Sequence, residues 1–238
     1  MILIVIPARL GSTRLQRKAL ANIQNKPMIQ WTYEKAQKSK FANEIIVATD
    51  SEEIKEVVEN FGGKCIMTSE NCQSGTERAF EVSQKFPEAE IIVNLQGDEP
   101  MMPIEILDGT IQEFINLDSK IRQIGTAVVP FQKEEDRLIP SFVKAVFNKS
   151  NKALYFSRAN LANAMLHVGL YVYTKQALKE FCSLEQSPLE KAEKLEQLRA
   201  IENNINIHVY KSNYSKPHFG IDTAEDLAKA NELISNNF

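Results

Sequence analysis

Short apolar runs alternate with amphipathic segments through the first hundred residues, and this alternation restricts the fold more than any other feature of the chain. The apolar runs occupy residues 2–6, 44–49, 64–67 and 90–95. Between them, helical spacing and helix-start signals predict helices over 27–39, from 51 to the glycine pair at 62–63, and over 75–86. Continuously apolar strands that alternate with amphipathic helices are typical of a parallel sheet covered on both faces. The pattern predicts an α/β fold with a mainly parallel sheet, and it places Trp31 in the core.

The second half of the chain changes character. Two β-rich runs over 143–157 surround the turn at 148–151 and predict a hairpin, and residues 167–173 and 205–210 predict further strands. Ser187, Pro188 and Glu190 form a helix start, from which we expect a helix to about residue 203, and a last helix covers 223–233. No repeat or linker interrupts the chain. We expect one domain over 1–238, with an antiparallel elaboration over about 130–205.

The overall charge excludes few partners. The 238 residues contain 28 Lys and Arg and 31 Asp and Glu, a formal net charge of −3, which argues against a nucleic-acid binder but not against a small anionic ligand.

The three cysteines have no metal-site spacing, and the apolar N-terminus has the features of a strand and lacks those of a signal peptide. No apolar run approaches membrane-spanning length. We expect a cytoplasmic protein without membrane insertion.

The loop after the first apolar run concentrates positive charge. Ligands of open α/β sheets bind beyond the carboxyl ends of the strands, and residues 9–18 occupy such a position. They include four cations, a glycine and two hydroxyls, a combination that suits a polyphosphate: Arg9, Gly11, Ser12, Thr13, Arg14, Arg17 and Lys18. Neither GxxxxGK[ST] nor GxGxxG is present, which disfavours a P-loop and a dehydrogenase. The alternative is a solvated basic loop.

Two acidic residues in separate loops are candidate ligands of Mg²⁺. Asp98 lies in the turn after the fourth apolar run, and Asp222 precedes the last helix. Two distant carboxylates that converge on one metal are common in phosphoryl transfer. The alternatives are an ordinary turn residue for Asp98 and a helix cap formed by Asp222 or Thr223.

A fourth loop, residues 73–78, leads into a helix. It could bind a base through its backbone groups and Arg78, or it could be a plain polar helix start. Single residues elsewhere give weaker signals. Arg158 and His167 stand at predicted strand ends. Glu196 and Gln197 lie on a charged helix, where the ordinary interpretation is a face exposed to solvent.

The ordered set of motifs resembles the 3-deoxy-manno-octulosonate cytidylyltransferase (CMP-Kdo synthetase) family. The matching stretches span nearly the whole chain, in the family's order: IPARLGSTRL, NKPMI, IIVATD, GGKCIMT, SGTER, VNLQGDEP, KALYFSRA, HVGLYVY, SPLE, LEQLR and GIDTAEDL. The resemblance implies a Rossmann-like nucleotidyltransferase fold with an insertion for sugar binding and dimerisation. It implies Mg²⁺-dependent attack of the anomeric hydroxyl of 3-deoxy-D-manno-octulosonate (Kdo) on the α-phosphate of CTP. CMP-Kdo for lipopolysaccharide biosynthesis and pyrophosphate would be the products, and the enzyme would be a homodimer.

The same resemblance assigns roles to individual residues. Those that would hold the triphosphate are Arg9, Gly11, Ser12, Arg14 and Lys18. Those that would lie near cytosine and ribose are Gln73, Ser74, Gly75, Thr76 and Arg78. Asp98 and Asp222 would bind Mg²⁺, and with Arg9, Arg14 and Lys18 they form the catalytic set. Those that would line the sugar-acid site are Gln96, Arg158, His167, Glu196 and Gln197, with Arg158 as the partner of the sugar carboxylate.

Two departures from the family pattern leave alternatives open. The family usually follows STRL with Pro-Gly-Lys-Pro-Leu, whereas this chain has Gln-Arg-Lys-Ala-Leu over 16–20. Only eight residues, 159–166, separate Arg158 from His167, and the family's longer Pro- and Arg-containing connection is missing. The alternatives are the same chemistry on a related acid sugar, 8-amino-Kdo or a sialic-type acid, and a nucleotide-binding homologue without catalysis.

Overall fold

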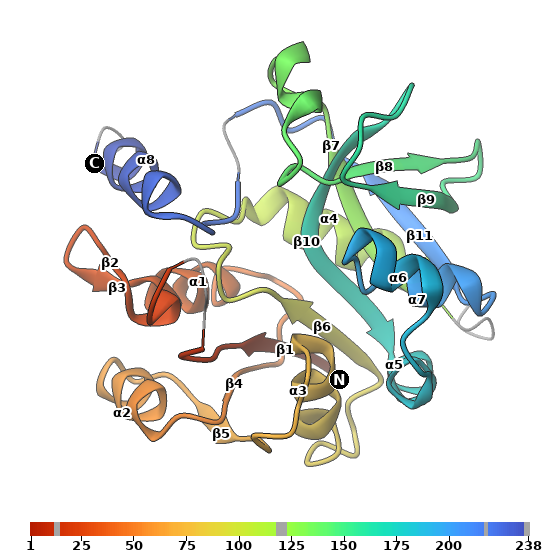
Figure 1. The fold of residues 1–238 in the computed structure, drawn as a ribbon. Helices are drawn as coiled ribbons and strands as arrows, with labels where there is room; N and C mark the ends of the chain where they lie inside the picture. The colour runs from red at the N-terminus through yellow and green to blue at the C-terminus, as the bar shows by residue number, and fades with distance from the viewer. Residues whose placement is uncertain (12–14, 118–122, 217–218, 236–238) are drawn as a thin grey trace. The chain divides into compact units, whose positions relative to one another are not determined.

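The computed structural model describes residues 1–11, 15–117, 123–216 and 219–235 (Figure 1). The chain divides into two compact units, one formed by Met1–Ile104 with His218–Phe238 and the other by Glu105–Pro217. We call them unit 1 and unit 2. Among the helices of the described residues, none has the length and apolar character needed to cross a membrane.

Unit 1 is built on the parallel strands that the sequence predicts. These are β1 (Ile2–Pro7), β4 (Glu44–Thr49), β5 (Cys65–Met67) and β6 (Ile91–Leu95), in the order β6-β1-β4-β5. Residues 3–6 of β1 have no exposed surface, which explains their continuous apolar pattern. The predicted α/β fold class with its mainly parallel sheet is confirmed.

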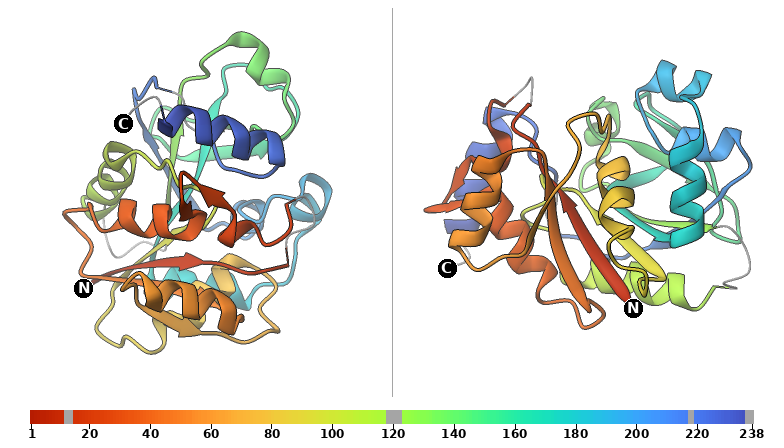
Figure 2. Two further views of the ribbon diagram at one scale, coloured as in Figure 1. Left: turned by 90° about the vertical axis from the view of Figure 1, so that its left-hand side faces the viewer. Right: turned by 90° about the horizontal axis from the view of Figure 1, so that it is seen from below.

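Three helices connect these strands: α1 (Met28–Ala36), α2 (Glu52–Asn60) and α3 (Gly75–Ser83). The right-hand view of Figure 2 shows α3 on one side of β1 and β4, and α1 and α2 on the other. Ser51 caps α2 by accepting a hydrogen bond from the Ile54 amide at 3.3 Å, as its sequence position predicts. Trp31 is 9% exposed and donates to the carbonyl of Ile23, so its predicted place in the core is confirmed.

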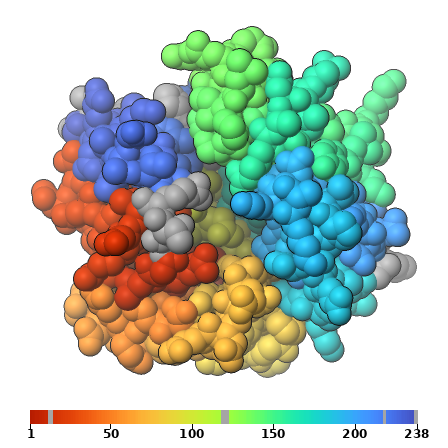
Figure 3. All heavy atoms as spheres, viewed as in Figure 1, coloured from red at the N-terminus to blue at the C-terminus, as the bar shows by residue number. Residues whose placement is uncertain are grey.

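The C-terminal helix α8 (Ala224–Ser235) completes unit 1 by packing against a small hairpin, β2 (Asn22–Ile23) and β3 (Lys26–Pro27). In the space-filling view, blue α8 lies beside the red hairpin segment (Figure 3). The amide of Gln24 donates to Asn231 Oδ1 at 3.0 Å, and Ile23, Ile221 and Ile234 share one apolar cluster. This packing fixes the segment that carries Asp222.

Unit 2 contains a mixed sheet. β7 (Gln123–Val129) pairs in parallel with β11 (Asn206–Lys211) and in antiparallel orientation with β10 (Met165–Thr174). The predicted hairpin is present as β8 (Lys144–Phe147) and β9 (Ala153–Ser157). In unit 2 the sequence did not predict β7, the helices α4 (Ile104–Ile115) and α5 (Lys175–Ser183) or the short 3₁₀ segment at Glu134–Leu138. In unit 1 it did not predict the 3₁₀ segment at Lys18–Leu20. The expectation of one domain over 1–238 stays a prediction.

The predicted continuous helix over 187–203 is wrong. Its start is as predicted, because Ser187 and Glu190 cap each other's amides, but the helix ends early, giving α6 (Pro188–Glu193) and α7 (Leu198–Glu202). Lys194 stops α6 by adopting a left-handed conformation, with φ 54° and ψ 47°. An L-residue in this conformation gives no compositional signal, since glycine is the usual residue there.

The left-handed Lys194 generates a stability prediction. The substitution Lys194→Gly should raise the free energy of unfolding by about 1 kcal/mol, because glycine adopts positive φ without steric cost. The matched variant Lys191→Gly, inside α6, lowers the same quantity by about 1 kcal/mol. Urea denaturation measures both. An equal loss in the two variants would contradict the left-handed end of α6.

Candidate active site

A pocket of about 310 Å³ opens in unit 1 at the carboxyl ends of β1 and β6 and the N-terminus of α3. Open α/β sheets bind ligands at this edge, where successive strands go to opposite sides of a central strand. Here that strand is β1, with β4 on one side and β6 on the other. Its lining joins four of the loops that the sequence singled out: Pro7, Ala8, Arg9, Gly11, Lys18, Ala19, Cys72, Ser74, Gly75, Arg78, Gln96, Gly97, Asp98 and Asp222.

The floor of the pocket contains two glycines that lie very close to Pro7. A Cβ added at Gly97 would lie 2.7 Å from the carbonyl oxygen of Pro7, and one at Gly75 would lie 2.9 Å from Pro7 Cγ. Thr32 Oγ1 also donates to the Gly97 carbonyl at 3.1 Å. The loops after β1 and β6 therefore approach at a distance that only glycine permits.

Lys18 joins the two candidate metal carboxylates. Its Nζ lies 2.5 Å from Asp98 Oδ2 and 2.9 Å from Asp222 Oδ1. Burial would lower the pKa of Lys18, but the negative charges and hydrogen bonds of Asp98 and Asp222 outweigh it and raise that pKa. Burial raises the pKa of Asp98, while the charge of Lys18 opposes this rise.

The donor set at this point fits a hard divalent cation. Both carboxylates reach a single cationic atom, so they converge on one position. In the ranges that the structure describes, no group of three or more His, Cys, Asp and Glu side chains gathers in metal-binding geometry. Two carboxylates without a full protein cage match the way Mg²⁺ binds, since it takes its remaining ligands from phosphate oxygens and water. Asp98 and Asp222 fit this role.

The competing interpretation of Asp222 as a helix cap is resolved by hydrogen bonding. Thr223 Oγ1 accepts from the Asp226 amide at 3.2 Å, and Asp226 Oδ2 accepts from the amides of Asp222 and Thr223. Thr223 and Asp226 therefore cap α8 reciprocally. The side-chain oxygen of Asp222 accepts from Lys18 instead.

The cation-rich loop is partly neutralised by carboxylates. Arg9 and Gly11 are exposed and line the pocket, while Ser12 and Arg14 lie outside the described residues. Arg17 forms an ion pair with Glu53 at the start of α2, and its backbone is left-handed with φ 53°. Arg17 thus adopts a left-handed conformation that costs glycine nothing, and Lys18 still lines the pocket.

The loop predicted to bind the base divides into two groups. Ser74, Gly75 and Arg78 line the pocket. Thr76 is 1% exposed and its hydroxyl accepts from Asn94, while Gln73 is exposed and its amide donates to Glu77. Neither of these two is part of the pocket lining.

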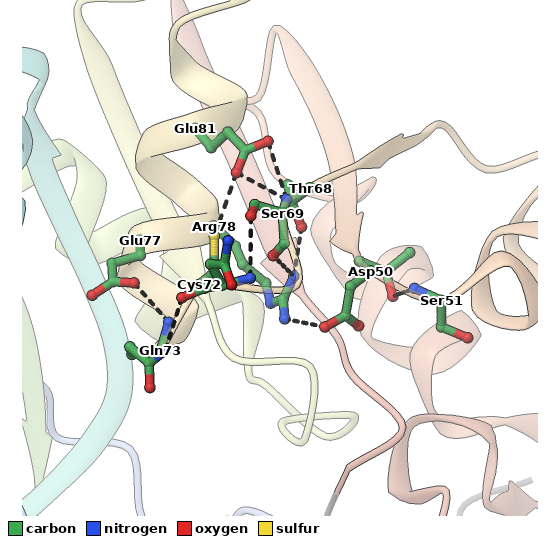
Figure 4. Close-up of polar contacts among 11 residues, drawn as sticks. Asp50, Ser51, Thr68, Ser69, Cys72, Gln73, Glu77, Arg78 and Glu81 are labelled. Carbon is green, nitrogen blue, oxygen red and sulfur yellow. Dashed lines mark hydrogen bonds and ion pairs between the residues drawn. The ribbon is translucent and has the colours of Figure 1, made fainter.

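Arg78 is buried and bonded within the protein (Figure 4). Its Nη1 donates to Thr68 Oγ1 and to the Ser69 carbonyl, and its Nη2 pairs with Asp50 Oδ2 at 2.5 Å. Sequence reasoning missed Asp50, although its position directly after β4 at the carboxyl edge was a usable signal. It also missed Cys72, which lines the pocket and for which the sequence offered no signal.

Four of the five residues predicted for the sugar acid lie in unit 2, and Gln96 lines the unit 1 pocket. The Arg158 guanidinium donates to the carbonyls of Pro140, Glu193 and Lys194, which uses three of its five N–H groups. Gln197 is 6% exposed, and among the described residues its amide Nε2 has no hydrogen-bond partner. A buried amide in this state can still bind a ligand acceptor.

His167 lies next to a bulge of β10, where the register shifts between Val168 and Tyr171. Its Nε2 is 2.9 Å from Thr126 Oγ1, whose single proton is donated to the Leu170 carbonyl. Thr126 must therefore accept, so we assign the proton of the neutral imidazole to Nε2, which leaves Nδ1 as an acceptor. Burial lowers the pKa of His167 to about 3. Burial and the charge of Glu196 raise the pKa of neighbouring Tyr171.

Comparison with known proteins gives the class first. A family model described as cytidylyltransferase matches residues 3–207, and the chain belongs to this family. Within it, the chain is 43% identical to the 3-deoxy-manno-octulosonate cytidylyltransferase of Francisella tularensis subsp. holarctica (strain FTNF002-00 / FTA), covering 98% of each protein. It is 44% identical to that of Thermodesulfovibrio yellowstonii, covering 97% of each.

A solved structure extends this similarity to the fold. It is CMP:2-keto-3-deoxy-manno-octonic acid synthetase complexed with CTP, 38% identical, with a TM-score of 0.92 over 100% of this chain and 99% of that one. The resemblance that the motifs indicated is therefore confirmed.

The partly buried, neutral His167 generates a pH prediction. Below pH 6.5 the unfolded chain protonates this histidine and the folded chain does not, so the free energy of unfolding decreases as the pH falls. Between pH 7.5 and 5 we expect His167 to contribute a loss of roughly 1–2 kcal/mol. His167→Gln, whose amide can still donate to Thr126, removes this contribution. Urea denaturation across the pH range measures it.

The control is His208→Gln, at the histidine that bonds Glu113 at 2.6 Å. It should retain the His167 contribution. An unchanged pH dependence in His167→Gln would contradict the neutral assignment.

Proposed function

We propose that this chain is a CTP-dependent nucleotidyltransferase that activates Kdo, releasing CMP-Kdo and pyrophosphate for lipopolysaccharide biosynthesis. The observation that carries the proposal is the pocket at the carboxyl ends of β1 and β6, where Lys18 joins Asp98 and Asp222. The identity of 43–44% to proteins named for this reaction, over nearly the whole chain, supports the choice of substrate.

The nucleotide belongs to unit 1. Arg9, Gly11 and Lys18 line this pocket, and with Ser12 and Arg14 of the same loop they bind the triphosphate, because cationic side chains and hydrogen-bond donors together suit its negative oxygens. Ser74 and Gly75 at the N-terminus of α3 bind near ribose and base, with Gln73, Thr76 and Arg78 as neighbours. This pocket is polar and charged, as a triphosphate requires.

Asp98 and Asp222 would hold Mg²⁺, which when bound neutralises phosphate charge and orients the reacting phosphoryl group. The chain's own part in the chemistry is positioning and charge. The anomeric hydroxyl loses its proton to solvent as its oxygen forms a bond to the α-phosphorus, and the bond from that phosphorus to the bridging oxygen of the β-phosphate breaks. Arg9 and Lys18 stabilise the charge that develops on the pyrophosphate as it leaves.

For the sugar acid we propose Arg158, His167, Glu196 and Gln197, which lie in unit 2. Gln96, which the resemblance adds to this set, lines the pocket of unit 1. Arg158 binds the sugar carboxylate through the N–H groups that its three carbonyl contacts do not use. Nδ1 of His167 accepts a hydrogen bond from a sugar hydroxyl, and the Gln197 side-chain amide donates one to a sugar oxygen. Apart from Glu196, these groups are neutral or cationic. Such a set suits an anionic sugar with several hydroxyls.

A second candidate substrate follows from the short connection over 159–166. A related acid sugar, 8-amino-Kdo or a sialic-type acid, would use the same chemistry. A panel of sugar acids with CTP held constant decides between them, because the rate of pyrophosphate release reports which sugar is turned over.

The assembly and location complete the proposal. We infer a homodimer, supported by apolar side chains that unit 2 exposes, Leu138 at 69% and Leu154 at 54%. Sedimentation velocity measures it. We also infer a cytoplasmic location, supported by an odd number of cysteines, which argues against a disulfide framework.

The test of function is Asp98→Asn. Wild-type protein should release pyrophosphate only when CTP, Mg²⁺ and Kdo are all present. Asp98→Asn should lower kcat by at least about a hundredfold, because a ligand of the metal loses its charge. A coupled pyrophosphate assay measures both.

The matched control is Asp136→Asn, a carboxylate of unit 2 outside the pocket lining. Its amide variant keeps an acceptor for the Lys133 amide, and its kcat should stay within about twofold of wild type. Near-normal turnover in Asp98→Asn would show that the metal assignment is wrong. CTP binding without turnover of any sugar acid would establish the inactive homologue.

A further inference from the structure

The connection from β5 to α3, residues 68–74, forms one wall of the pocket. We call it the β5–α3 loop. Cys72 and Ser74 of this loop line the pocket together with Gly75, the first residue of α3. Inside the loop the Cys72 amide donates to the Ser69 carbonyl at 3.3 Å and closes a turn at residues 70–71. Further contacts come from side chains outside the loop.

Two carboxylates of α3 hold the loop backbone (Figure 4). Both oxygens of Glu81 accept from the Ser69 amide, at 3.0 and 3.2 Å, and one also accepts from Cys72 Sγ at 3.4 Å. Glu77 Oε2 accepts from the Gln73 amide at 2.6 Å. Glu77 and Glu81 are one helical turn apart, so they face the loop that precedes their own helix.

Arg78 holds the beginning of the same loop. Its guanidinium reaches Thr68 Oγ1 at 2.6 Å and the Ser69 carbonyl at 3.2 Å. Asp50, directly after β4, fixes the other end of the guanidinium at 2.5 Å. With side-chain exposures of 4% for Arg78 and 23% for Asp50, this ion pair is largely withdrawn from water and therefore strongly oriented.

These contacts fix the loop before any ligand arrives. The bonds reach its beginning, middle and end, and all of their partners stand on α3 or at the end of β4. A binding wall that is ordered in advance lowers the entropic cost of binding and preserves discrimination between similar ligands. Neither Asp50 nor Glu81 is part of the pocket lining, so any effect they have on binding passes through the loop.

We propose that Asp50 and Glu81 are positioning residues that set the affinity and the base selectivity of the nucleotide pocket by fixing the β5–α3 loop and Arg78. The inference rests on the proposed nucleotide site. A cytosine ring differs from uracil in its exocyclic amine and in the ring nitrogen beside it. Backbone groups can distinguish these patterns only when they are held in place, because a mobile wall adapts to either base.

The kinetic test uses Glu81→Ala and the conservative Glu81→Gln. Glu81→Ala should raise the KM for CTP about tenfold and leave kcat within about twofold, because the loop contacts the base and not the reacting phosphate. The ratio of kcat/KM for CTP to that for UTP should fall by a similar factor. Glu81→Gln keeps one acceptor for the Ser69 amide and should give intermediate values. Glu56→Ala, an exposed carboxylate on α2, is the matched control and should match wild type.

The second readout does not depend on activity. Burial, the hydrogen bond to Glu81 and its charge raise the pKa of Cys72 to about 11. Removing Glu81 lowers this pKa, so iodoacetamide at pH 8 should alkylate Cys72 several-fold faster, measured by peptide mass spectrometry. Cys65 is the internal reference, because its pKa is raised to about 11 by burial and by Glu59. Bound CTP should slow alkylation of Cys72 in wild-type protein.

Asp50→Asn should raise the KM for CTP in the same direction. It also leaves Arg78 buried without its carboxylate, which destabilises the fold, and the Glu81 variants therefore test the inference independently. Normal CTP binding and selectivity in Glu81→Ala, together with faster Cys72 alkylation, would overturn this inference alone. Failure of wild-type protein to bind CTP in calorimetry would overturn the proposed function as well.

Discussion

The contact of Lys18 with Asp98 and Asp222 is the interaction on which the pocket of unit 1 depends. It joins three segments that are far apart in the chain: the loop after β1, the turn after β6 and the residues that precede α8. Two of these segments are also joined through their backbones, since the Ile221 amide donates to the Asp98 carbonyl, and Ile221 packs in the apolar cluster with α8. The charged groups therefore meet because the backbone brings them together. Their attraction then fixes the side chains at the point where a phosphate and its metal would bind.

Sequence reasoning succeeded where a local pattern has one physical meaning. The continuous apolar run at residues 44–49 became β4, and Ser51 and Ser187 became helix caps, because a hydroxyl before a helical run has few other uses. The ordered motifs identified the family, and Asp98 and Asp222 do converge. These results rest on short-range chemistry that the sequence expresses directly.

Three features of the structure have no local signal in the sequence. Lys194 ends α6 through a backbone conformation that its residue type does not announce. Arg78 was predicted to lie beside the nucleotide, and the structure adds that its guanidinium is occupied by Asp50, a residue 28 positions away. The separation of Thr76 from the pocket depends on which way the first turn of α3 faces. For Arg78 and Thr76 the partners are distant in the chain, so no short window of sequence contains them.

The backbone contact between Gly97 and Pro7 bears on how substitutions in this protein are interpreted. Gly97 has no functional group, yet a single methyl there would displace the loop that carries Asp98. A mutational scan would thus rank it beside the charged residues of the pocket, although it takes no part in any reaction. In this fold, intolerance to substitution marks the places where two strand ends nearly touch as well as the places where chemistry occurs.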